Sequence, residues 1–173
     1  MLRIGKIEDT LDGRLRREPL CDAAGIRFTP GFDITDFELT TPSSVRKLYR
    51  QLSPAAPDVP DFLARGMVRK YERINWIVNR SVRSMFQGDD LLDGKLSQLH
   101  MPTLLIWGRM DHITPLSVGV ALHQQIPQSA LEIYDGCGHL APGQCARRIG
   151  PRMVEFLNGN GPEPQKTVEI TQR

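Results

Sequence analysis

The chain has 173 residues, enough for one domain with a single hydrophobic core. Its 22 basic and 20 acidic residues leave a net charge of +2, and no long basic run occurs, which argues against a nucleic-acid-binding protein. No apolar run is long enough to span a membrane, and the first residues lack the apolar core of a signal peptide, so we expect a cytoplasmic protein. Cys21, Cys137 and Cys145 form no C-x-x-C pair, and their odd number predicts reduced thiols.

The first half of the chain is predicted to be mainly helical. Residues 18–25 (EPLCDAAG) resemble the end of a short strand that enters a turn, although Pro19 disfavours a central position in a sheet. Residues 25–39 have no sustained period and predict a loop. A helix is expected over 40–52, with Thr or Ser as its cap beside Pro42. After the break SPAAPDVP, apolar residues recur every three or four positions over 61–87 and predict one long or two shorter amphipathic helices.

The second half alternates between strands and helices. The apolar run 101–108 (MPTLLIWG) predicts a strand buried on both faces, and 130–136 predicts a second strand. Helices are expected over 115–127 and 144–159, the latter bent at Pro151. Strand, helix, strand, helix with short connections predicts a right-handed parallel α/β unit. The Gly/Pro-rich residues 158–173 are expected to be a disordered tail.

Two polar residues follow the predicted strands of this unit. Asp111 comes three residues after Gly108, and His139 lies in YDGCGHLAP, just beyond the second strand. The carboxyl ends of parallel strands share one edge of a sheet, so both side chains can meet there. A carboxylate that accepts a hydrogen bond from His Nδ1 leaves Nε2 free to act as a general base. The plainer alternative is a loop histidine bonded to backbone.

These residues carry a resemblance to a known family. WGRMDHITP (107–115), IPQSALEIYDGCGHL (126–140) and EFL (155–157) resemble the carboxyl-terminal third of the α/β-hydrolase family, of the esterase, epoxide hydrolase and carbon–carbon-bond hydrolase type. The shared pattern is G-x-x-D-x-x-x-P, from Gly108 to Pro115, followed by G-x-G-H, which ends at His139. The resemblance extends over most of residues 20–157.

The resemblance implies a partial α/β-hydrolase fold. Residues 1–25 would be the remnant of a core helix and the sixth strand, 26–95 a helical cap, and 96–157 the carboxyl-terminal α/β core. The short parallel sheet would have about three strands, near 18–22, 103–107 and 130–134, and its open apolar edge predicts self-association or pairing with another chain. Asp111 would be the acid and His139 the base of a catalytic triad, and Asp22 is a weaker candidate for the acid.

The nucleophile of the family is missing from the sequence. The family carries it in a G-x-S-x-G elbow upstream of the cap. Eight serines occur, and none has glycine two residues before and two residues after it; they are Ser43, Ser44, Ser53, Ser81, Ser84, Ser97, Ser117 and Ser129. The strands that carry the oxyanion hole also have no counterpart, so we expect a truncated hydrolase that is inactive alone. The alternative is a non-catalytic α/β module that binds a partner at the open sheet edge or in the cap groove.

The remaining expectations concern ligands. After His139 the family commonly has Pro, Glu and Pro where this chain has Ala141, Gln144 and Ala146, which departs from the pattern at the start of the last helix. His112 and Cys137 match no structural zinc spacing, so neither a metal nor a cofactor is predicted. A hydrophobic, ester-like small molecule is the expected substrate of the completed fold. Some apolar residues are candidates for the substrate pocket or for plain core, namely Met67, Trp76, Met85 and Phe86, and Trp107 is expected in the sheet core.

Overall fold

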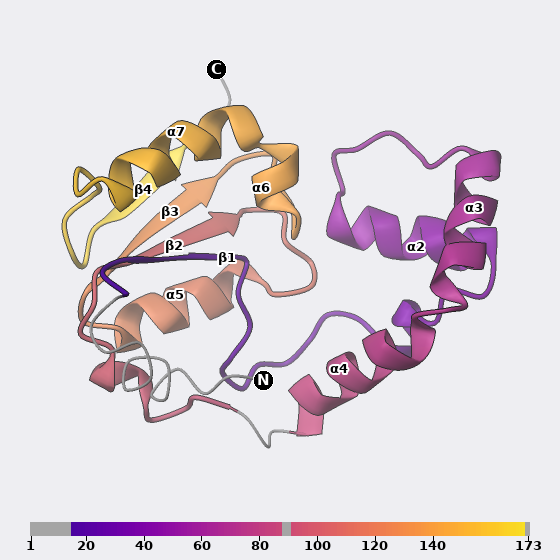
Figure 1. Cartoon of the computed structure of the whole chain (residues 1–173), viewed down its shortest axis with the longest axis horizontal. Helices are drawn as coiled ribbons and strands as arrows, with labels where there is room; N and C mark the ends of the chain where they lie inside the picture. The colour runs from indigo at the N-terminus through magenta and orange to yellow at the C-terminus, as the bar shows by residue number, and fades with distance from the viewer. Residues whose placement is uncertain (1–14, 88–90, 172–173) are drawn as a thin grey trace.

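The computed structural model describes residues 15–87 and 91–171, with the side chains of 85–87 excluded. Four parallel strands form one sheet in the order β1-β2-β3-β4 (Figure 1). They are β1 (Glu18–Cys21), β2 (Thr103–Gly108), β3 (Ser129–Tyr134) and β4 (Thr167–Ile170). The predicted parallel α/β arrangement is confirmed, and the three predicted strands correspond to β1, β2 and β3.

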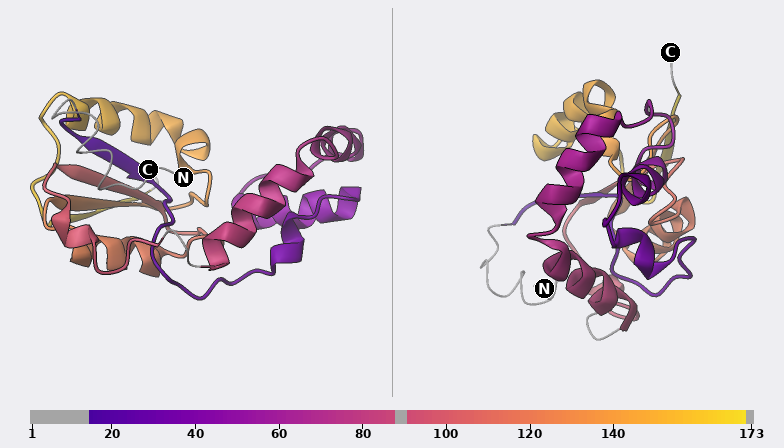
Figure 2. Two further views of the ribbon diagram at one scale, coloured as in Figure 1. Left: turned by 60° about the horizontal axis from the view of Figure 1, so that its bottom comes forward. Right: turned by 90° about the vertical axis from the view of Figure 1, so that its right-hand side faces the viewer.

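Helices cover both faces of the sheet. Helix α5 (Leu116–Gln125) packs on one face, while α6 (Ala141–Gln144) and α7 (Ala146–Leu157) lie on the other (Figure 2). Alternate residues of a strand point to opposite faces. Leu105 and Trp107 therefore join the cluster that includes α5, and Leu104 and Ile106 join the cluster that includes α7. Burial on both faces explains why β2 is an uninterrupted apolar run.

A separate helical segment extends from the carboxyl-terminal ends of the strands (Figure 2). It consists of η1 (Ile34–Phe37), α2 (Pro42–Leu52), α3 (Asp61–Tyr71) and α4 (Asn75–Gln87), so the pattern over 61–87 forms two helices. Thr41 caps α2 as predicted, by accepting a hydrogen bond from the Ser44 N–H. The segment has its own apolar cluster, into which Ile113 from the loop after β2 inserts. This contact ties the helical segment to the loop that carries Asp111.

Three predictions need correction. The tail is not disordered throughout, because Thr167–Ile170 form β4, and Arg109 pairs with Asp135 and Glu169 across the ends of β3 and β4. The final helix begins earlier than predicted and is divided into α6 and α7, and Pro151 lies within α7. Residues 26–39 contain the short 3-10 helix η1, which Asp33 caps. β4 is not apparent in the sequence because polar residues surround it, and only alternate side chains of an edge strand need be apolar.

Pro19 fits β1 because of the direction of its backbone. The Glu18 N–H donates to the carbonyl oxygen of Pro102, just before β2, and the Asp22 N–H donates to that of Ile106 within β2, so the even-numbered residues bond to this strand. Position 19 then faces the other edge, where the missing N–H of proline breaks no hydrogen bond with β2. Among the described residues, that other edge of β1 pairs with no strand. No helix in the described ranges is long and apolar enough to cross a membrane.

Candidate active site

Asp111 is fixed in the loop after β2. Its side chain is fully buried. Oδ1 accepts hydrogen bonds from the backbone N–H groups of Ile113 and Thr114, at 2.8 and 2.9 Å, and the Thr114 hydroxyl lies 2.8 Å from Oδ2. The buried Trp107 indole donates to the Thr114 carbonyl oxygen at 2.9 Å, which anchors the same loop to the sheet core. A carboxylate held by several donors is fixed in position.

His139 meets this carboxylate. Its Nδ1 lies 2.9 Å from Asp111 Oδ2 and 3.2 Å from the Thr114 hydroxyl oxygen. A carboxylate oxygen accepts hydrogen bonds, so the geometry places the ring proton on Nδ1 and the lone pair on Nε2. The imidazole remains 25% exposed, so the ring is accessible to a reacting group. The structure thus brings together the two residues that the sequence predicted to meet.

Glycines allow the loop of His139 to cross the end of β2. A Cβ atom at Gly108 would lie 2.3 Å from the Gly138 carbonyl oxygen and 2.6 Å from that of Cys137. Gly136 has a φ of +73°, which turns the chain directly after β3. The backbone N–H of Met110 donates to the Cys137 carbonyl oxygen at 2.9 Å. The two loops are therefore bonded backbone to backbone, and this close approach positions His139 over Asp111.

Asp22 supports the site from β1. Its Oδ1 accepts from the Gly108 N–H at 2.8 Å and its Oδ2 from the Ala141 N–H at 3.1 Å, so one carboxylate joins the loops after β1, β2 and β3. Burial raises the pKa of Asp22 to about 7, and the charge of Asp111 adds to this rise, while the two N–H donors and His139 oppose it. The carboxylate bonds to backbone, and the acid that bonds to the imidazole is Asp111.

Cysteines 137 and 145 form a disulfide, with their Cα atoms 6.2 Å apart. The prediction of reduced thiols is therefore wrong for these two residues. An odd number of cysteines does not exclude one disulfide, and the fold brings this pair together. The bond closes a loop that contains His139. Cys21 is free, and burial raises the pKa of its thiol to about 11, with a further contribution from Asp22. Within the described ranges, no group of three or more His, Cys, Asp or Glu side chains could hold a metal ion.

Two functional contacts were missed in the sequence. The Thr114 hydroxyl contacts both Asp111 and His139. This position follows from the geometry of the loop after β2 and not from a sequence motif. Gln144 occupies a position where the family commonly has glutamate; its Oε1 accepts from the Gly138 N–H at 2.6 Å, and its Nε2 donates to the Leu52 carbonyl oxygen at 2.9 Å. Gln144 thus joins the loop of His139 to the end of α2. The amide can serve both contacts because it carries an acceptor and a donor.

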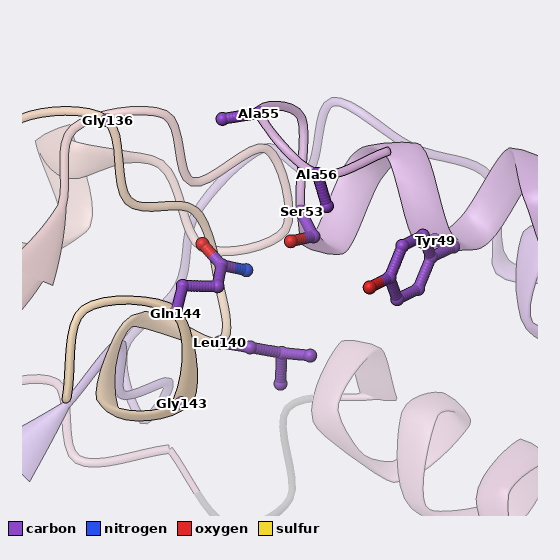
Figure 3. Close-up of a pocket in the computed structure, with 8 residues that line it drawn as sticks. All are labelled: Tyr49, Ser53, Ala55, Ala56, Gly136, Leu140, Gly143 and Gln144. Atoms are coloured by element: carbon purple, nitrogen blue, oxygen red, sulfur yellow. The ribbon is translucent and has the colours of Figure 1, made fainter. Parts of the chain in front are cut away.

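A pocket of about 430 Å³ lies where the helical segment meets the loop of His139; we refer to it as the junction pocket. The hydroxyl groups of Tyr49 and Ser53 point toward it from the helical segment, and Leu140 faces them from the other side (Figure 3). Of the four apolar pocket candidates, Met67 lines a second pocket, described below, and Trp76 is largely exposed. Met85 and Phe86 lie outside the described side chains.

A parallel sheet with an acid after one strand and a histidine after the next defines a class of hydrolase-like α/β proteins. The chain belongs to the α/β hydrolase fold family, whose model matches residues 15–144. A 2-hydroxy-6-oxononadienedioate/2-hydroxy-6-oxononatrienedioate hydrolase of Pseudomonas putida is 30% identical over 92 residues, which make up 53% of this chain and 32% of that protein. A hydrolase of the same name from Burkholderia vietnamiensis is 38% identical over 63 residues, 36% of this chain and 22% of that protein.

Solved structures share the fold. The meta-cleavage product hydrolase of Pseudomonas fluorescens IP01 superposes with a TM-score of 0.63 at 24% identity, covering 88% of this chain and 59% of that one. A serine hydrolase of Cycloclasticus zankles gives a TM-score of 0.71 at 19% identity, covering 89% of this chain and 59% of that one. The chain therefore spans less than two thirds of these structures, and its matches span about a third or less of the curated relatives.

Proposed function

We propose that this chain supplies the acid–base pair and the cap of a hydrolase that cleaves an ester or a related bond next to a carbonyl group. The contact of 2.9 Å between His139 Nδ1 and Asp111 Oδ2 carries the proposal. The nucleophile and the oxyanion donors would come from a segment outside these 173 residues. The relatives named as hydrolases of 2-hydroxy-6-oxo dienedioates support a carbonyl substrate.

The chemistry follows from the tautomer of His139. Nε2 takes the proton of the nucleophile as that group attacks the carbonyl carbon, and it later gives the proton to the leaving group. The Asp111 carboxylate accepts the hydrogen bond from Nδ1 and stabilises the imidazolium that forms between these two transfers. Thr114 and the N–H donors on Asp111 keep the carboxylate in place, so that the ring does not have to reorient during the reaction.

The open edge of β1 is where the missing segment would pair. At this edge Pro19 offers no N–H, so hydrogen bonding there relies on Cys21 and on the carbonyl groups of both residues. Residues 26–95, which include the helical segment, would act as the cap over the completed site. The junction pocket, which Leu140 next to His139 helps to line, would lie beneath this cap and could hold part of the substrate.

The 173-residue chain alone is expected to hydrolyse p-nitrophenyl acetate no faster than its His139→Ala variant. Loss of the nucleophile from a catalytic triad costs on the order of a million-fold in turnover. Turnover by the chain alone that disappears in His139→Ala would contradict the assignment of the nucleophile to another segment.

The DNA upstream of the codon for Met1 provides the complementary test. We expect it to encode a G-x-S-x-G elbow, in frame or in a neighbouring frame, and the lengthened or co-expressed protein should hydrolyse the ester only with His139 and Asp111 intact. An upstream region without such a motif, together with an inactive chain, would favour the non-catalytic module.

A further inference from the structure

A second pocket lies within the helical segment, between η1, α2, α3 and α4; we refer to it as the α2–α4 pocket. Its volume is about 350 Å³, which is within the range of small-molecule sites. Leu39, Val45 and Leu48 form a buried floor. Met67 and Ile74 line it as well and are 41% and 38% exposed, so apolar side chains lead from solvent to the floor. An apolar ligand would bury surface that the protein alone leaves in contact with water.

Lys70 is the only charged residue among those that line this pocket. No ion pair in the described part of the chain involves it, whereas Lys47 on the neighbouring helix pairs with Asp36. Arg69 precedes it in the last turn of α3 and adds a second positive charge. The pocket therefore combines an apolar interior with an unpaired cation.

Two tyrosines line the wall of the α2–α4 pocket, Tyr49 and Tyr71. Neither the Tyr49 nor the Tyr71 hydroxyl has a hydrogen-bond partner among the side chains that the structure describes. The phenol of Tyr71 can donate a hydrogen bond, and burial raises its pKa further above the ordinary value. Tyr49 also lines the junction pocket, toward which its hydroxyl points (Figure 3). Its ring is thus a shared wall between the two pockets.

We propose that the α2–α4 pocket binds a small amphipathic anion, with an apolar body on the floor and a carboxylate paired with Lys70. Lys70 is solvent-exposed, so its charge lies where the pocket opens to water. A cationic ligand would place like charges together there, whereas a carboxylate would gain an ion pair that a neutral ligand lacks. The site goes beyond the proposed hydrolysis, because none of its lining residues belongs to the acid–base pair. Binding can therefore be measured without any turnover.

Octanoate is a suitable probe, and 1-octanol is its uncharged counterpart. In ¹H–¹⁵N spectra of the full chain, we expect octanoate to shift resonances of pocket residues such as Leu48 and Tyr71 in a saturable manner. Lys70→Met keeps the apolar stem and should weaken octanoate binding about two- to five-fold while leaving 1-octanol unchanged, since an exposed ion pair contributes at most about 1 kcal/mol. Arg69→Met, on the same helix but outside the pocket lining, is the matched control and should retain most of the affinity for both probes.

Three further results decide the matter. Met67→Trp fills the exposed rim and should abolish binding of both probes without changing the melting temperature. His139→Ala should leave binding unchanged, which separates this site from the proposed chemistry. Absence of saturable shifts, equal affinity for octanoate and 1-octanol, or equal losses in Lys70→Met and Arg69→Met would overturn the proposal.

Discussion

Replacing Arg152 with methionine is expected to lower the free energy of unfolding by about 3–5 kcal/mol, because it leaves a buried carboxylate without its cation. Glu132 in β3 is fully buried, and its Oε1 accepts from Arg152 Nε at 2.8 Å and from a terminal nitrogen of the same guanidinium. The Tyr134 hydroxyl donates to Oε2 at 2.6 Å and would be the one remaining partner of Glu132 among the described side chains. Chemical denaturation of the two proteins measures the difference.

Two variants make this prediction specific. Arg147→Met, one turn away on α7 and exposed, should change stability by less than about 0.5 kcal/mol. The double variant Arg152→Met with Glu132→Gln should recover much of the loss, because an uncharged amide can still accept from Tyr134. Equal stability of Arg152→Met and the parent protein would show that the pair does not hold α7 to the sheet.

The free energy of unfolding of the parent protein is expected to fall as the pH rises from about 4 to about 7, and this fall should be absent in the Asp22→Asn variant. The folded pKa of Asp22, about 7, lies above its ordinary value of 3.8. In that window the native state holds a proton that the unfolded state has released, so the free energy of unfolding falls as the pH rises. This loss of stability is at most about 4 kcal/mol. It is complete above pH 7 and absent below pH 4.

The comparison of the two proteins isolates this effect from other titrations. The pKa of His123 is lowered by burial, and its ionisation acts in the opposite direction, but equally in both proteins. The Asp22→Asn variant would also lose one of the two backbone contacts, a cost that is independent of pH over this range. A stability difference that is the same at pH 4 and pH 7 would show that Asp22 titrates normally.

The sheet and the acid–base pair could be predicted because each depends on a local signal. The apolar run of β2 and the polar residues just after β2 and β3 determine which side chains reach the carboxyl edge. This rule alone predicts that Asp111 and His139 meet.

Other features depend on contacts between distant parts of the chain. Alternation places Glu132 on the face of β3 opposite Leu131. Helix α7 covers that face and supplies Arg152, a contact that the sequence of β3 does not indicate. The disulfide forms because the loop around His139 turns and brings the two cysteines together. β4 forms by pairing with β3. The role of Gln144 depends on the position of Leu52, 92 residues away. None of these contacts leaves a periodic or motif-like trace in the sequence.

The ring tautomer of His139 tests the central claim most directly. In ¹⁵N-labelled protein at alkaline pH, two-bond ¹H–¹⁵N spectra distinguish a protonated ring nitrogen from one with a free lone pair. The structure predicts a proton on Nδ1 and a lone pair on Nε2, a preference that should weaken in Asp111→Asn because the amide no longer demands a donor. A proton on Nε2 in the parent protein, or a spectrum unchanged in Asp111→Asn, would contradict the assignment of His139 and Asp111 as a hydrolytic acid–base pair.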